Sequence, residues 1–203
     1  MTGEITDSED IGTPEPEPFN SARALYARNN FIHQFVQRPG QHLLEVGRTG
    51  TGKTQFLYYM VDLFREFAPN EAQVWFDIGK TSEILTLAEC WSPVQLITLE
   101  GCEIHIDAEK QYDIKRVQVK ECKDVWRVID PTRLNIASFE PFILDPLVLS
   151  KQISRMFREL IFTAHRHGIY TPLTLIYDEF HNVCPAHGYG YAGTGNEARE
   201  QIT

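Results

Sequence analysis

Two kinds of hydrophobic pattern alternate along the chain. Short apolar runs, typical of strands buried on both faces, occupy residues 42–46, 73–78, 134–137 and 173–177. Between these runs, apolar residues recur every three or four positions, as on the buried face of a helix. We expect helices at residues 21–37, 53–67, 82–89 and 145–168. This alternation predicts an α/β fold in which a mostly parallel central sheet lies between two layers of helices.

The region between residues 94 and 130 has a different pattern. It contains several short runs rich in β-branched and apolar residues, and the pair Glu100-Gly101 is typical of a tight turn. We expect an inserted β-hairpin region at the edge of the main sheet. Its strands are predicted at residues 96–99, 102–106, 116–119 and 125–129.

Charge is distributed unevenly along the chain. Residues 1–18 contain six acidic residues, three prolines and no lysine or arginine, so we predict a disordered acidic tail. This tail carries −6 of the formal net charge of −9, which leaves −3 for the domain predicted at residues 19–203. A nearly balanced domain lacks the strong basic footprint of a dedicated DNA-binding module.

The composition also bears on localisation. No apolar run approaches the roughly 20 residues that cross a bilayer, and the first residues do not resemble a signal peptide. We therefore expect a cytoplasmic protein without a membrane span. The four cysteines have no paired spacing and are expected to be small core residues without disulfides; they are Cys90, Cys102, Cys122 and Cys184.

A glycine-rich segment between the first apolar run and the helix at 53–67 fits the P-loop pattern. Its glycines allow backbone N–H groups to surround phosphate oxygens, and the following helix adds the positive end of its dipole. Lys53 would reach the β- and γ-phosphates, and the Thr54 hydroxyl would bind Mg²⁺. The alternative is a glycine-rich turn that binds nothing. The motif predicts a P-loop NTPase fold and ATP as ligand, bound by Gly47, Arg48, Thr49, Gly50, Thr51, Gly52, Lys53, Thr54 and Gln55.

A second motif ends the apolar run at 173–177. Asp178 and Glu179 follow directly, at the end of a strand where open α/β sheets bind ligands. We expect Asp178 to be the second metal residue beside Thr54. Glu179 would polarise the attacking water and, with Lys53, form the catalytic pair. A solvated acidic turn is the alternative reading of these two residues.

Other polar groups have simpler interpretations. The run of His181, Cys184 and His187 has only three possible zinc ligands, where a structural site uses four, and we expect local packing instead. His165 and His167 are expected to complement a helix C-terminus. The basic residues of the 94–130 region are expected to form a solvated face, with nucleic-acid contact as the alternative; they are Lys115, Arg116, Lys120 and Lys123.

Three stretches resemble the FtsK/HerA superfamily of P-loop motor ATPases. Residues 41–54 are similar to its first strand and Walker A motif, 74–80 to its second strand, and 176–182 to its Walker B motif. The resemblance implies ATP hydrolysis with Mg²⁺ that moves DNA through a ring of subunits, usually a hexamer. It also implies elements beyond residue 203, among them a sensor glutamine and an arginine finger.

Two other functions stay open at this point. A module that binds ATP for sensing or assembly, with little hydrolysis, would use the same P-loop. The sequence Asp178-Glu179-Phe180-His181 is also superficially like that of a DEAH helicase, although no arginine-containing helicase motif is evident between the two Walker elements. GTP is not expected, because the guanine-selecting Asn-Lys-x-Asp motif is missing from the sequence. The DNA substrate, the size of the ring and the partner proteins are not specified by the motifs.

Overall fold

The computed structural model describes residues 21–48, 50–77, 83–106, 111–143, 145–167 and 172–178. The chain divides into two compact units, Met1–Gln41 and His42–Thr203. The first unit contains helix α1 (Ala22–Phe31), which continues as a π-helix, η1 (Ile32–Val36). The Ser21 hydroxyl caps α1 by accepting a hydrogen bond of 3.1 Å from the Ala24 N–H. The helix predicted at 21–37 is therefore confirmed.

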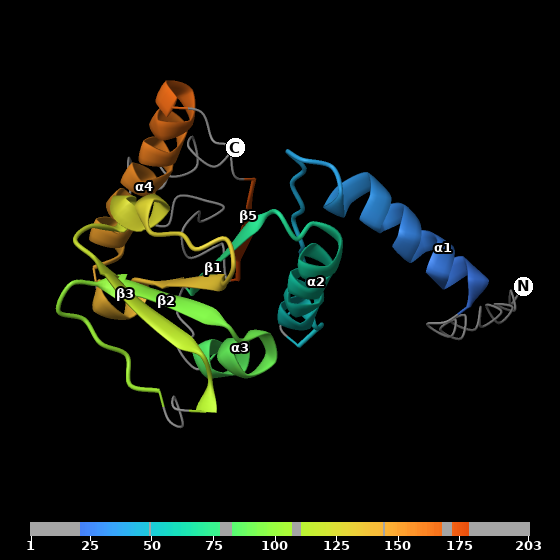
Figure 1. Cartoon of the computed structure of the whole chain (residues 1–203), viewed down its shortest axis with the longest axis horizontal. Helices are drawn as coiled ribbons and strands as arrows, with labels where there is room; N and C mark the ends of the chain where they lie inside the picture. The colour runs from blue at the N-terminus through green and yellow to red at the C-terminus, as the bar shows by residue number, and fades with distance from the viewer. Residues whose placement is uncertain are drawn as a thin grey trace, which may run out of the picture. The chain divides into compact units, whose positions relative to one another are not determined.

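The second unit is built around five parallel strands (Figure 1). Their order across the sheet is β3-β2-β4-β1-β5, and every neighbouring pair is parallel. The strands are β1 (Ala72–Asp77), β2 (Val94–Leu99), β3 (Ile114–Val119), β4 (Leu134–Ser138) and β5 (Leu173–Tyr177). Because all strands run the same way, their carboxyl ends meet at one edge of the sheet.

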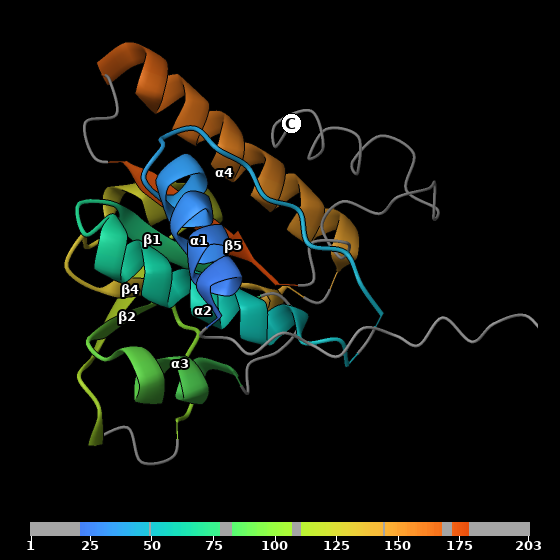
Figure 2. The same cartoon turned by 90° about the vertical axis from the view of Figure 1, so that its right-hand side faces the viewer.

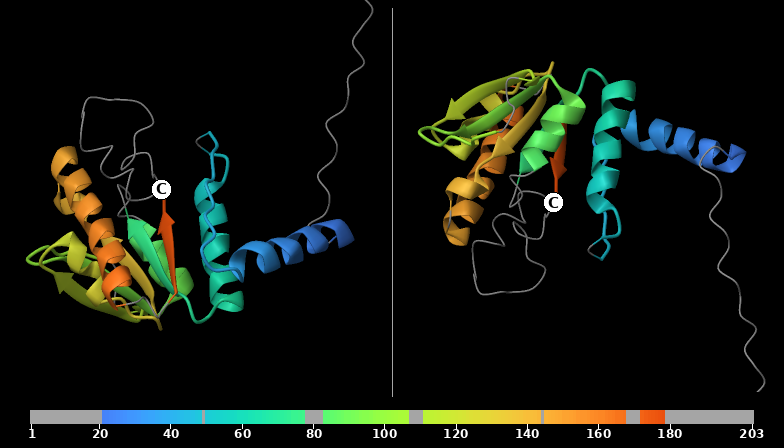
Figure 3. Two further views of the ribbon diagram at one scale, coloured as in Figure 1. Left: turned by 90° about the horizontal axis from the view of Figure 1, so that it is seen from above. Right: turned by 90° about the horizontal axis from the view of Figure 1, so that it is seen from below.

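Helices pack on both faces of this sheet (Figures 2 and 3). One face packs against α2 (Lys53–Phe67) and α3 (Glu83–Trp91), with Val61 and Leu87 buried against Trp75 and Ile136. The other face packs against α4 (Pro146–His167) and the 3-10 helix η3 (Cys122–Arg127). A second 3-10 helix, η4 (Glu140–Phe142), precedes α4. The unit thus has the helix–sheet–helix layers that the hydrophobic pattern predicted.

The inserted hairpin is a wrong prediction. The turn at Glu100-Gly101 exists, with φ of 74° at Gly101 and a 3.0 Å hydrogen bond from the Cys102 N–H to the Leu99 carbonyl. However, residues 102–106 form no strand, and β3 returns parallel to β2 as the edge strand of the main sheet. The strand predicted at 125–129 is also wrong, since residues 122–127 form η3. A turn signal shows where the chain bends, but not which strand it joins next.

The strand predicted at 42–46 is not formed either. Residues 41–48 have neither helix nor strand, and Leu44 and Val46 expose 76% and 85% of their surface. Strand formation requires a neighbouring backbone as well as apolar side chains. In the sheet as described, residues 42–46 pair with neither of the edge strands, β3 and β5.

The cysteines are free thiols wherever the structure describes them, as expected, but they differ in burial. Cys122 is buried, and desolvation raises the pKa of its thiol to about 12. Cys102 is half-buried, and Cys90 is exposed on α3, so the prediction of a core position is wrong for Cys90. Cys184 lies outside the described residues.

A buried amide joins three strands near their amino ends. The Asn135 side chain, fully buried in β4, donates to the carbonyl oxygens of Gln73 (3.0 Å), Asp130 (2.9 Å) and Arg133 (3.1 Å). Its Oδ1 accepts from Gln95 Nε2 at 2.9 Å and from the Asp130 N–H at 2.9 Å. These bonds link β1, β2 and β4 and fix the loop before β4.

The Asn135→Asp variant tests this role. A carboxylate has no N–H, so it would place negative charge against three carbonyl oxygens inside the protein. We expect the free energy of unfolding to fall by about 3–5 kcal/mol, measured by chemical denaturation. The matched control is Asn70→Asp, the same change at an exposed turn position after α2, with an effect within about 0.5 kcal/mol. Equal losses in both variants would contradict the role of Asn135.

Candidate nucleotide-binding site

The segment before α2 turns sharply at two glycines. Gly50 and Gly52 have φ angles of 84° and 90°, in the left-handed region where a Cβ would be strained. Gly52 occupies the N-cap position of α2, and the Phe56 N–H donates to its carbonyl at 2.9 Å. The first N–H groups of a helix have no partners within the helix. Because the N-cap residue has no side chain, these donors lie open to an anion.

The predicted phosphate-binding lysine lies within this loop. Lys53 Nζ donates to the carbonyl oxygens of Gly47 and Arg48, each at 3.1 Å. Thr51 Oγ1 donates to the same Arg48 carbonyl at 2.8 Å. A Cβ added at Gly47 would lie 2.6 Å from Thr51 Oγ1, so glycine allows the loop to close this tightly. The cationic end of Lys53 therefore points into the loop rather than out into solvent.

The two predicted metal residues lie in contact. Thr54 Oγ1, in the first turn of α2, donates a 2.8 Å hydrogen bond to Asp178 Oδ2, which follows β5 directly. Asp178 exposes only 7% of its surface. The fold thus brings together two side chains that are 124 positions apart in the sequence. One element supplies a hydroxyl beside the glycine loop, and the other supplies a carboxylate from the sheet edge.

The remaining predicted site residues divide into two groups. Arg48 and Gln55 are exposed beside the loop. Thr49 and Glu179 lie outside the described residues, and so do His181, Cys184 and His187. In the part of the chain that the structure does describe, no group of three or more His, Cys, Asp or Glu residues could hold a metal.

The sequence motifs give no separate role to Asp77, which lies beside Asp178, or to Ser138 on the next strand. Asp77 ends β1 and is paired in register with Ser138, which ends β4. Ser138 Oγ donates to Asp77 Oδ2 at 2.6 Å, and both residues are buried. A sequence signal for Asp77 exists, since it ends an apolar strand as Asp178 does. Nothing in the sequence, however, specifies that the two strands are neighbours.

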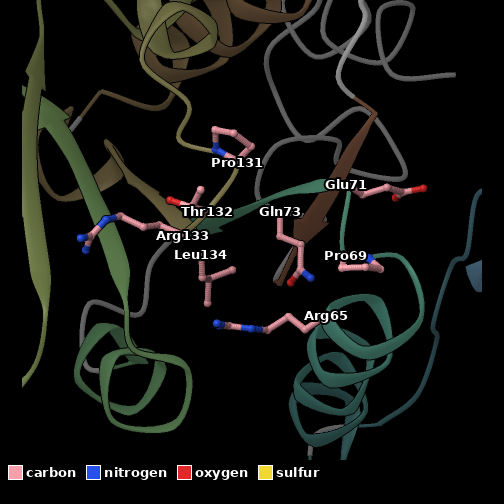
Figure 4. A pocket seen from close by; sticks show the side chains of 8 residues that line it. All are labelled: Arg65, Pro69, Glu71, Gln73, Pro131, Thr132, Arg133 and Leu134. Carbon is pink, nitrogen blue, oxygen red and sulfur yellow. The ribbon is translucent and has the colours of Figure 1, made fainter.

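A small cavity of about 170 Å³ lies at the opposite end of the sheet (Figure 4). Its wall includes Gln73 at the start of β1 and Leu134 at the start of β4. Arg65, near the end of α2, lies at its rim but donates to the Trp91 carbonyl at 2.8 Å. The other lining residues are Pro69, Glu71, Pro131, Thr132 and Arg133. This cavity is separate from the glycine loop, because the strands extend between the two.

The basic residues around β3 are largely satisfied by neighbours. Lys115 pairs with Asp130 and Lys123 with Glu121, each at 3.1 Å, and Arg116 donates to the Ile104 carbonyl at 2.8 Å. Lys120 is exposed. Two of these four cations, Lys115 and Lys123, are thus paired with carboxylates, which suits the solvated face that we expected more than a nucleic-acid contact. His165 is exposed in the last turn of α4.

The fold and the site define an α/β protein with a parallel sheet, a glycine-rich loop and a hydroxyl–carboxylate contact at the carboxyl ends of its strands. No family model matches the sequence, and searches of curated proteins and of solved structures find no match. The likeness to FtsK/HerA motor ATPases therefore depends on the sequence motifs alone. Among the helices that the structure describes, none combines the length and hydrophobicity of a membrane span.

A double-mutant cycle tests whether Thr54 and Asp178 interact in the folded protein. Their hydrogen bond is part-buried, so Thr54→Ala and Asp178→Asn should not have additive effects on the free energy of unfolding. We expect a coupling energy of about 0.5–3 kcal/mol, measured by chemical denaturation without nucleotide. The control cycle combines Thr54→Ala with Glu89→Gln, on the exposed surface of α3, and should be additive. A coupling energy near zero for the first cycle would mean that the contact does not exist in solution.

Proposed function

We propose that the chain binds ATP with Mg²⁺ through the loop at residues 47–54 and hydrolyses it as the motor domain of a DNA translocase-like protein. The observation that carries the nucleotide site is the contact of Thr54 with Asp178 beside the N-terminus of α2. Translocation, DNA as the partner and a ring of subunits depend on the resemblance to FtsK/HerA proteins.

The residues at this contact suit Mg²⁺. The ion prefers oxygen ligands and usually binds one or two protein groups together with substrate phosphates and water. Thr54 Oγ1 and Asp178 Oδ2 are 2.8 Å apart and half-buried or buried, so one ion could be held by both groups, in part through water. Bound Mg²⁺ would neutralise charge that develops on the phosphates during hydrolysis.

Each protein group then has a distinct task. The loop N–H groups and Lys53 bind phosphate oxygens, which replace the carbonyl partners that Lys53 has now. Glu179, the residue after Asp178, is the proposed general base for the attacking water. An arginine finger from a neighbouring subunit can add about 10³–10⁵ in rate, so turnover by an isolated subunit should be slow.

Two variants separate binding from hydrolysis. Lys53→Ala removes the phosphate-binding cation, so Mg·ATP binding should be lost at millimolar nucleotide in calorimetric titrations. Glu179→Gln removes only the proposed base, so it should still bind ATP but release no phosphate. Glu89→Gln, on the surface of α3, is the matched carboxylate control and should behave as the unmodified protein. Binding without phosphate release by the unmodified protein, even with DNA, would instead favour a sensing or assembly module.

The exposed cations of helix α4 support the proposal of a polyanionic partner. Four exposed cations, Lys151, Arg155, Arg158 and Arg166, follow the outer face of the helix at spacings of four, three and eight residues. The exposed Phe162 lies between the last two, and the Arg166 guanidinium is 5.9 Å from its ring centroid. Residues 146–167 contain one acidic residue, Glu159, against these four cations in a chain of net charge −9.

The geometry of this basic face suits a phosphate backbone. Helical rise of 1.5 Å per residue spreads the four cations over about 22 Å, a length that spans several phosphates of one strand. None of the four has an ion pair within the described ranges, unlike the cations around β3. Basic side chains interspersed with an exposed aromatic ring are typical of surfaces that bind nucleic acid.

Neutralising this face tests the DNA assignment. In the triple variant Lys151→Gln, Arg155→Gln, Arg158→Gln, DNA affinity should fall, and the slope of log affinity against log salt should decrease by about 1 for each lost phosphate contact. Fluorescence anisotropy with single-stranded and duplex DNA at several salt concentrations measures both. The control variant neutralises Lys115, Lys123 and Arg127, which are already paired with carboxylates. Equal slopes for the two variants would exclude α4 as the DNA-binding face.

A further inference from the structure

The carboxyl ends of three neighbouring strands form a buried polar row. Ser138 ends β4, Asp77 ends β1, and Asp178 follows β5, with exposed fractions of 0%, 2% and 7%. Their strands are adjacent in the sheet in this order. Open α/β sheets bind ligands outside the carboxyl ends of their strands, so this row lies where a ligand would bind.

Register places the two aspartates at the same level of the sheet. Phe76 is paired with Tyr177, so Asp77 and Asp178, one residue further along each strand, lie side by side. Neighbouring strands are about 4.8 Å apart, so the Cα atoms of Asp77 and Asp178 are separated by a similar distance.

Both side chains also point to the same face. Trp75 and Ile176 pack in the core cluster with Val61 of α2, whereas Phe76 and Tyr177 pack on the α4 face, where their rings stack with centroids 4.3 Å apart. Alternation along a strand returns Asp77 to the α2 face. The Thr54–Asp178 hydrogen bond shows that Asp178 faces the N-terminus of α2 as well.

Each of these carboxylates accepts a hydrogen bond from a neighbouring hydroxyl group. Ser138 Oγ donates to Asp77 Oδ2 at 2.6 Å, and Thr54 Oγ1 donates to Asp178 Oδ2 at 2.8 Å. A hydroxyl donor stabilises an ionised carboxylate and limits its rotation. Two such groups side by side repel each other, and a divalent cation nearby lowers that energy.

We propose that Asp77 is the second carboxylate of the metal site. Asp178 and Thr54 are nearest the ion, Asp77 orients water bound to it through hydrogen bonds, and Ser138 holds Asp77 in place. This assignment rests on the proposed Mg·ATP function. It adds a residue from a strand to which the P-loop and Walker B motifs give no metal role.

The test measures Mg²⁺ affinity rather than turnover. Protein saturated with a fluorescent ATP analogue is titrated with Mg²⁺, and the analogue's affinity is measured separately in EDTA. Asp77→Asn should raise the Mg²⁺ concentration at half-saturation about 10–100-fold, as loss of a group that orients metal ligands does. Its affinity for the analogue in EDTA should stay the same or increase, because a negative charge near the phosphates is removed.

Control variants distinguish a metal role from a structural one. Glu89→Gln removes an exposed carboxylate of α3 and should leave the Mg²⁺ titration unchanged. Ser138→Ala should shift it in the same direction as Asp77→Asn but by less, and it keeps the proposal testable if Asp77→Asn does not fold. A structural role for Asp77 would weaken binding equally with and without Mg²⁺, and that result would overturn the proposal.

The outcomes for the two proposals are separable. If the unmodified protein binds the analogue with Mg²⁺ and both Asp77→Asn and Ser138→Ala match it, the role of Asp77 is overturned and the nucleotide site stands. If the unmodified protein binds no analogue under either condition, the proposed function fails, and the role of Asp77 fails with it.

Discussion

The hydrogen bond between Thr54 and Asp178 connects the two parts of the chain on which any nucleotide chemistry would depend. Thr54 belongs to the first turn of α2, and Asp178 directly follows β5, the last described strand. Their contact requires α2 to pack against the correct face of the sheet with its N-terminus at the carboxyl ends of the strands. The hydrophobic cluster of Val61, Trp75 and Ile176 supplies that packing. The site is thus a consequence of core packing as much as of the glycine loop.

Parallel pairing explains why the polar residues meet where they do. Each strand from β1 to β5 runs in the same direction, so residues that are widely separated in sequence share one edge. The buried positions of Asp77 and Ser138 are costly for polar groups unless they are hydrogen-bonded. The 2.6 Å hydrogen bond from Ser138 Oγ to Asp77 Oδ2 offsets part of that cost.

Elements that depend on the local sequence were predicted well, whereas elements that depend on pairing with a distant strand were predicted poorly. The bounds of α2 and β5 agree with those expected, because helical spacing before Pro69 and a run of apolar residues before Asp178 are properties of the local sequence. Residues 42–46 have the composition of a strand, but strand formation depends on a partner that no local pattern specifies. The same limit explains β3, because the turn at Gly101 does not specify that this strand pairs parallel with β2. For the site, the P-loop and Walker B motifs indicated Thr54 and Asp178 individually. That Asp77 lies next to Asp178 could be seen only from the order of the strands in the sheet.

The Asn135 network has a consequence for how this fold can change. Its hydrogen bonds lie near the amino ends of β1, β2 and β4, whereas the glycine loop and the aspartates lie at the carboxyl ends. The hydrogen-bond network and the proposed nucleotide site therefore lie at opposite ends of the same strands. Substitutions around the proposed site need not weaken the hydrogen bonds at the other end, so residues there could change while the strand arrangement is kept.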